Sequence, residues 1–284
     1  MARELLADPL NGNVRYRVDL AGVDDDDLEK GVEPLRDALS ARLGLPVLVD
    51  NDANAAGLAE AQLGAGRGHR FVLCVNLGTG LGGSLVLDGE IYRGAAGMAG
   101  EFGHMQVVPD GLRCPCGNRG CWEQYASGNA LVRDARELVL TDSPVAHHLR
   151  ELAGADSAGL TGPMITEAAR TGDALATELI ADMGRWLGVG LANMTAAFDP
   201  GCIVVGGGVS EAGDLLLDPT REAFSRQLVG RGHRAEPVIV GAALGPDAGF
   251  IGAADMARSA ARRRRTSRLR RDRVARRRRL LERD

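Results

Sequence analysis

The sequence lacks long apolar runs. No stretch of the 284 residues approaches the ~20 consecutive apolar residues that a membrane-spanning helix needs. The first ten residues, MARELLADPL, contain no apolar h-region of the kind that marks a secretory signal peptide. Its five cysteines, three of them clustered, do not form the distributed disulfide framework of a small secreted domain. These absences exclude membrane-spanning and disulfide-rich secreted proteins and predict a soluble, cytoplasmic one.

Internal repeats are also lacking, whereas glycine is abundant. The chain has 39 glycines in 284 residues, about twice the usual ~7%, which indicates many tight backbone turns. The length is sufficient to bury a large core, in one large domain or in two smaller ones.

Charge is distributed unevenly along the chain. The net charge is −4, but residues 258–284 hold 14 arginines against three acids, and the remaining 257 residues are strongly acidic. The acidic body argues against nucleic acid as the main partner. The basic segment has little apolar content, so we predict a disordered tail over 258–284, with binding to nucleic acid or a membrane surface as the alternative.

Hydrophobic patterning predicts strands that are joined by hairpins in one part and by helices in another. Such a mixture is typical of an α/β fold with a mixed sheet. The expected helices cover 33–43, 53–64, 187–198, 219–228 and 248–256, and the expected strands cover 46–52, 71–76, 84–87, 90–92, 202–205 and 237–240.

Two glycine-rich turns follow apolar strands. LGTGLGG matches G-x-G-x-x-G, but a strand pattern follows it, so the dinucleotide-binding reading fails because that fingerprint must open a helix. The turn Gly78-Thr79-Gly80 either closes a hairpin or holds phosphate oxygens with backbone N–H groups and a hydroxyl. Gly206-Gly207-Gly208 is a weak signal alone, since three glycines only permit close approach of a ligand or a helix. Together the two turns suggest two sides of a nucleotide cleft.

Acidic and amide side chains cluster in Asp50-Asn51-Asp52, between an expected strand and an expected helix. Asn51 or Asp52 is suited to be the N-cap of that helix. Alternatively, Asp52 is a carboxylate at a ligand-gathering strand end, where it would take a proton from a hydroxyl that attacks a phosphoryl group.

One histidine and three cysteines lie close together in His104-x9-Cys114-x-Cys116-x4-Cys121. This set matches a closed, structural zinc site with no open position for water. A disulfide is the alternative, but Cys114 and Cys116 are too close in sequence to pair easily. The metal would fix Glu101, His104 and Glu123, and carboxylates of this kind suit a polyhydroxylated substrate.

Five segments, in this order, resemble the ROK family of repressors, open reading frames and kinases, nearest to its actinobacterial-type glucokinases: VDNDANAA, VNLGTGLGG, GEFGH, CPCGNRGCWEQYASG and IVVGGGVS. The resemblance covers about residues 30–257. It implies an actin-like (ribonuclease H-like) sugar-kinase fold of two α/β domains, with an incomplete N-terminal small domain at 1–34, the large domain at 35–257 with a zinc loop at 100–128, and a C-terminal helix that returns to the small domain.

The resemblance also implies a reaction, ATP- and Mg²⁺-dependent phosphorylation of glucose at its 6-hydroxyl, and a homodimer or homotetramer. Asp52 would be the general base. Sugar hydroxyls would be bound by Asn51, Glu101, His104 and Glu123. Zinc would be held by His104, Cys114, Cys116 and Cys121. ATP would lie against Gly78, Thr79, Gly80, Gly206, Gly207 and Gly208.

One family motif is missing from the N-terminal part. The D-x-G-G-T-type turn that cradles phosphates does not precede Asp50, and we therefore expect this sequence to be a poor kinase. The alternative function is a non-catalytic, sugar-binding regulator, although no helix-turn-helix pattern is visible in the first 22 residues. Mannose, fructose and N-acetylmannosamine remain alternative substrates.

Overall fold

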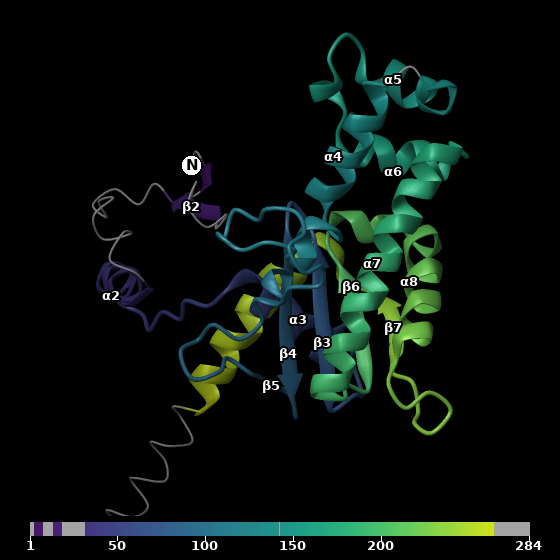
Figure 1. Ribbon diagram of the computed structural model, residues 1–284. Helices are drawn as coiled ribbons and strands as arrows, with labels where there is room; N and C mark the ends of the chain where they lie inside the picture. The colour runs from purple at the N-terminus through teal and green to yellow at the C-terminus, as the bar shows by residue number, and fades with distance from the viewer. Residues whose placement is uncertain (1–2, 8–13, 19–31, 142, 264–284) are drawn as a thin grey trace, which may run out of the picture.

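A five-stranded mixed sheet forms the centre of the molecule in a computed structural model, which describes residues 3–7, 14–18, 32–141 and 143–263 (Figure 1). The strand order is β5-β4-β3-β6-β7. The first three strands pair antiparallel through hairpins, whereas β3, β6 and β7 are parallel. The strands are β3 (Phe71–Leu77), β4 (Leu81–Leu87), β5 (Glu90–Ile91), β6 (Cys202–Gly206) and β7 (Val238–Gly241).

Both faces of this sheet are buried. Along β3, Leu73 and Val75 belong to one hydrophobic cluster and Val72 and Cys74 to another. Successive side chains of a strand point to opposite faces, so a nearly continuous apolar strand indicates a sheet covered on both sides. A layer of helices therefore lies on each face.

The larger cluster packs against α7 (Ala174–Phe198) and α8 (Asp214–Gln227). Two glycines of α7 let the two helices approach closely. A Cβ at Gly188 would lie 2.4 Å from the carbonyl oxygen of Thr220, and one at Gly184 would lie 2.7 Å from that of Leu216. At one end of this layer α4 (Gly128–Val139), α5 (His147–Ala153) and α6 (Gly162–Arg170) extend the helical part (Figure 1).

The other face is covered by α3 (Asp52–Leu63) and a helix over residues 248–263. The two helices cross at Gly252, where a Cβ would lie 1.7 Å from the carbonyl oxygen of Ala55. Glu60 is buried and its carboxylate accepts from three backbone N–H groups, those of Ala65 at 2.9 Å, Ala243 at 3.1 Å and Leu244 at 2.8 Å. This carboxylate ties α3 to the segment that leads into the last helix.

Most predicted elements are confirmed, including the helix at 33–43, which is α2 (Val32–Leu43). The strand predicted over 46–52 is wrong, because residues 46–51 form no strand and α3 already begins at Asp52. Leu45 and Leu48 are 64% and 54% exposed, and a strand needs a hydrogen-bonding neighbour, which this segment lacks among the described residues.

Several predicted boundaries also move, and the largest shift is that of the helix predicted over 187–198, since α7 already begins at Ala174. Strand β4 begins at Leu81, so Gly83 belongs to the strand and not to the turn. Helix α8 begins at Asp214, with Pro219 inside it. Residues 258–263 continue the last helix, in contrast to the disorder predicted from 258, and 264–284 lie outside the described residues.

The N-terminal region contributes β1 (Arg3–Ala7) and β2 (Val14–Val18), which pair antiparallel. The rest of 1–31, where an incomplete small domain was predicted, lies outside the described residues. Among the described helices, none combines the length and the apolar character needed to cross a membrane.

Candidate active site and metal centre

The one-histidine, three-cysteine cluster is assembled as its spacing predicted. The ligand atoms of His104, Cys114, Cys116 and Cys121 all lie within 4.8 Å of one another. The Nδ1 atom of His104 is 3.6 Å from the Cys114 sulfur, and the sulfurs of Cys116 and Cys121 are also 3.6 Å apart. All five cysteines of the chain are thiols, so the disulfide alternative is not realised.

These distances fit a tetrahedral zinc ion. A metal bound at ~2.3 Å to sulfur and ~2.0 Å to nitrogen separates its ligand atoms by roughly 3.5–3.8 Å. Four protein ligands fill a tetrahedral shell, so the donor set suits a structural metal. Because Nδ1 of His104 faces the sulfurs, its other ring nitrogen, Nε2, is left to meet a ligand.

The thiols respond differently to their surroundings. Burial raises the pKa of the Cys114 thiol well above its usual range, and this thiol donates to the Glu123 carboxylate over 3.1 Å. Burial is also the largest single influence at Cys116 and acts in the same direction, but hydrogen bonds from the Asn118 backbone N–H and from the thiols of Cys114 and Cys121 together lower the pKa of this thiol. A zinc-bound thiolate carries no proton, so with metal in place Oε1 of Glu123 can accept from another donor.

The backbone of the zinc loop (residues 100–128) folds tightly on itself. The Cys114 N–H donates to the Asn118 carbonyl at 2.9 Å, and the Gly120 N–H donates to the Leu112 carbonyl at 2.8 Å. Gly120 has φ +72°, and a Cβ there would lie 1.6 Å from the Val108 carbonyl oxygen. Only glycine fits this position.

Trp122 anchors the loop to the core. Its side chain is fully buried, and its indole N–H donates to the Trp186 carbonyl of α7 at 2.9 Å. The ring lies against Gly190, where a Cβ would be 2.0 Å from it. Trp122 begins the 3₁₀ helix η2 (Trp122–Gln124), so this anchor also places Glu123.

The GEFGH segment lies against β4. A Cβ at Gly100 would be 2.6 Å from the Gly83 carbonyl oxygen, and one at Gly103 would be 2.3 Å from that of Leu81. These two glycines let the segment, with its 3₁₀ helix η1 (Phe102–His104), run beside the strand. Glu101, which is exposed, and His104 are therefore carried to the start of β4.

The 78–80 turn, which precedes β4, lies close to the carboxylate of Glu123. A Cβ at Gly80 would lie 2.7 Å from Oε2 of Glu123, and Oε1 of that residue is 3.5 Å from Nδ1 of His104. The carbonyls of Gly78 and Thr79 accept from the first backbone N–H groups of α4, at 2.8 and 3.3 Å. The predicted phosphate turn and a predicted sugar ligand are thus in contact.

The second glycine turn is next to the first. Asn76 and Gly206 are partners in the parallel β3–β6 ladder, so both turns leave the same edge of the sheet. Gly207 has φ +86°, and a Cβ there would lie 2.4 Å from the Leu77 carbonyl oxygen. Gly208 opens the 3₁₀ helix η5 (Gly208–Ala212).

Asn51 is the N-cap of α3. Its side-chain oxygen accepts from the backbone N–H groups of Ala53 at 2.8 Å and Asn54 at 3.2 Å. Asp52 is the first residue of the helix and is exposed. The helix end reaches β4 as well, since a Cβ at Gly82 would lie 3.4 Å from the Cβ of Ala53.

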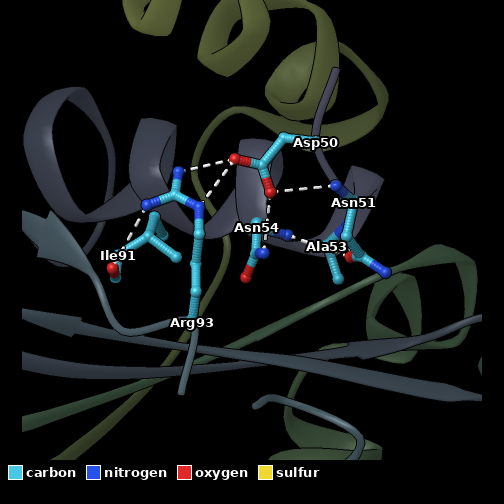
Figure 2. A network of polar contacts seen from close by, with 6 residues as sticks. All are labelled: Asp50, Asn51, Ala53, Asn54, Ile91 and Arg93. Carbon is cyan, nitrogen blue, oxygen red and sulfur yellow. Dashed lines mark hydrogen bonds and ion pairs between the residues drawn. The ribbon is translucent and has the colours of Figure 1, made fainter. Parts of the chain in front are cut away.

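An ion pair that sequence reasoning missed holds this helix end (Figure 2). Arg93 donates to Oδ2 of Asp50 from Nη2 at 2.5 Å and from Nε at 3.0 Å. Oδ1 of Asp50 accepts from the Asn51 N–H and from the side-chain amide of Asn54, both at 2.9 Å. The partners are 43 residues apart, so no local pattern could have revealed them.

Comparisons with known proteins identify the family of this chain. The family model described as "ROK family" matches residues 26–260. The glucokinase of Streptomyces coelicolor is 48% identical over 226 residues, which is 80% of this chain and 71% of the relative.

Two solved structures are also similar. One is a ROK family glucokinase from Streptomyces griseus in complex with glucose and AMPPNP, with 49% identity and a TM-score of 0.75 over 80% of this chain and 73% of that one. The other is a ROK family transcriptional regulator homologous to the E. coli MLC protein, with 30% identity and a TM-score of 0.70 over 79% of this chain and 55% of that one. The fold is the actin-like, ribonuclease H-like fold of ROK sugar kinases. The chain belongs to the ROK family.

Proposed function

We propose that this protein is an ATP-dependent hexose kinase of low turnover, which phosphorylates glucose at the 6-hydroxyl. The observation that carries the proposal is the contact between Glu123 and Gly80, because it brings a hydroxyl-binding carboxylate to the edge of a phosphate-binding turn. The likeness to a glucokinase solved with glucose and AMPPNP supports the same two ligands.

Glucose is held by side chains of the zinc loop and of the α3 end. The carboxylates of Glu101 and Glu123 each accept from sugar hydroxyls, and Nε2 of His104 adds a third contact. Asn51 contributes through its side-chain amide group, since its oxygen already caps α3. Zinc supplies structure and not chemistry, because four protein ligands occupy its shell.

Asp52 is the general base. Its carboxylate accepts the proton of the 6-hydroxyl as the oxygen attacks the γ-phosphorus of ATP. The 78–80 turn and the 206–208 turn hold the nucleotide with backbone N–H groups, and Thr79 adds a hydroxyl. Mg²⁺, when bound with the nucleotide, neutralises phosphate charge.

A coupled assay with ATP, Mg²⁺ and each of glucose, mannose, fructose and N-acetylmannosamine tests the reaction. The Asp52→Asn variant should turn over ~10²–10⁴-fold more slowly, since a general base contributes that much, while calorimetry should find glucose affinity within about threefold of wild type.

Asp214→Asn is the matched control, because Asp214 is likewise the first residue of a helix, α8. It should leave turnover unchanged. Near-normal turnover of Asp52→Asn would show that Asp52 serves only the start of α3.

A regulator is the second candidate function, favoured by the likeness to the MLC homologue. If the protein binds glucose tightly but phosphorylates none of the four sugars, the regulator function is supported.

A further inference from the structure

The side chain of Arg93 joins the segment that follows β5 to the segment that precedes α3. Its guanidinium makes the two bonds to Oδ2 of Asp50, and Nη1 also donates to the Ile91 carbonyl at 3.4 Å (Figure 2). Because two nitrogens of the rigid, planar guanidinium donate to the same carboxylate oxygen, they restrict the direction of the contact as well as its length.

The main chain of Arg93 closes a loop. Its carbonyl accepts from the Ala99 N–H at 3.1 Å, so residues 93 and 99 form the neck of this loop. Gly94 and Gly97, at φ +70° and +77°, provide its turns. Gly100 and Glu101 follow directly, and the position of Glu101 therefore depends on this neck.

The carboxylate of Asp50 organises the other side. Oδ1 accepts from the Asn51 N–H and from the side chain of Asn54, which is 97% buried. With Arg93 on Oδ2, both oxygens of Asp50 are occupied. The residue before the N-cap is thus fixed, and with it the entry of the chain into α3 at Asp52.

We propose that Arg93 is a positioning residue for phosphoryl transfer, which sets the distance between Asp52 and Glu101 by clamping Asp50 to the neck of the 93–99 loop. The proposal rests on the proposed function, in which these two carboxylates touch the same sugar. Arg93 acts through Asp50 and needs no contact with substrate.

A role in stability alone does not fit the exposure of the pair. The side chains of Arg93 and Asp50 are 45% and 18% exposed, and ion pairs with an exposed partner contribute little to folding. An effect on the reaction rate can be much larger than this effect on stability, since misplacement of a catalytic group by ~1 Å can lower the rate ~10²-fold.

The test compares Arg93→Met, Arg93→Lys and Asp50→Asn with the control Arg70→Met. Arg70 and Asp88 form an arginine–aspartate pair, 2.6 Å long, where β3 begins and β4 ends. We expect Arg93→Met to lower kcat for glucose by ~10–100-fold, with KM for ATP and the unfolding midpoint unchanged. Arg93→Lys should be intermediate, and Arg93→Met combined with Asp50→Asn should be no worse than the more impaired single variant.

Hydrogen–deuterium exchange supplies a readout that does not need turnover. Arg93→Met should speed exchange in both 51–56 and 100–104, whereas Arg70→Met should not. If the wild-type protein phosphorylates no hexose but Arg93→Met still speeds exchange in both segments, the proposed function is wrong and the positioning role of Arg93 is supported. Unchanged exchange and unchanged kcat in Arg93→Met would overturn the proposal, as would losses that only follow a lowered unfolding midpoint.

Discussion

The two sides of the candidate sugar site are held in place by different means. On one side, residues 100–128 bury Cys121 completely and Cys114 to 94%, and they place the four residues of the candidate metal cluster within 18 residues of sequence. On the other side, Asn51 and Asp52 are exposed, and a helix cap and one long-range ion pair fix them.

The comparison indicates that the candidate metal cluster positions the side chains of one side and that hydrogen bonds position those of the other. A loop with little core of its own needs a strong cross-link, which a structural metal provides. A helix end that already packs on a sheet needs only its cap and a neighbour. Loss of the metal should therefore loosen residues 100–128 without loosening the start of α3, which keeps its cap and its ion pair.

Removal of zinc should have the largest effect. Metal analysis should find about one zinc per chain, and both chelation and Cys116→Ser should loosen residues 100–128 and weaken glucose binding more than tenfold. We expect a loss of several kcal/mol of stability, seen as a fall of roughly 10 °C in the unfolding midpoint. Hydrogen exchange in 51–56 should stay unchanged.

Cys202→Ala is the control for zinc, because Cys202 is a buried thiol of β6 outside the cluster. It should retain the full metal content. A metal-free wild-type protein with the same unfolding midpoint would contradict the zinc assignment.

A smaller effect is expected from Gly120→Ala in the same loop. The new Cβ would collide with the Val108 carbonyl at a positive φ, so destabilisation of roughly 2–4 kcal/mol should follow. Gly117→Ala is matched to it, since Gly117 has φ +97° but open space around the Cβ, and it should cost only about 1–2 kcal/mol. Equal unfolding midpoints for the two variants would remove the close-packing argument.

The smallest effect concerns the contact between the two ligand-binding regions. Gly80→Ala would displace the carboxylate of Glu123, and the loss of about 1 kcal/mol in a hydrogen bond should raise KM for glucose about fivefold. Gly78→Ala meets nothing within 4 Å and should leave this KM within about twofold. If both variants raise it equally, Glu123 and the turn are not coupled.

The one-histidine, three-cysteine cluster was predictable because its members are close in sequence and their chemistry is distinctive. The positions of β3 and β6 were predictable for a similar reason, since each is an apolar run that ends in glycine. The sequence suggested that the two glycine turns form two sides of one cleft, and the parallel pairing of Asn76 with Gly206 brings both turns to the same edge of the sheet.

What could not be predicted depends on contacts between distant segments. Residues 46–50 have the composition of a strand, but composition does not supply a pairing partner. Asp50 was noted only as a member of the acidic and amide cluster at 50–52, and its contact with Arg93 could not be found by spacing. Pro219 was expected near the start of its helix, yet α8 extends five residues before it, because the packing of Leu216 and Leu217 against the core outweighs local preference.

The carboxylate of Glu60 has a mechanical consequence. It accepts hydrogen bonds both from the loop after α3 and from the backbone of residues 243–244. Where α3 and the helix over 248–263 cross, Gly252 and Ala55 are in close contact, which leaves no room for one helix to shift along the other. Helix α3 is thereby held at two points: at Glu60 to the segment before the last helix, and at Ala55 to the last helix itself. We expect the two helices to move as one unit, so that a displacement of the last helix also displaces the start of α3 at Asp52.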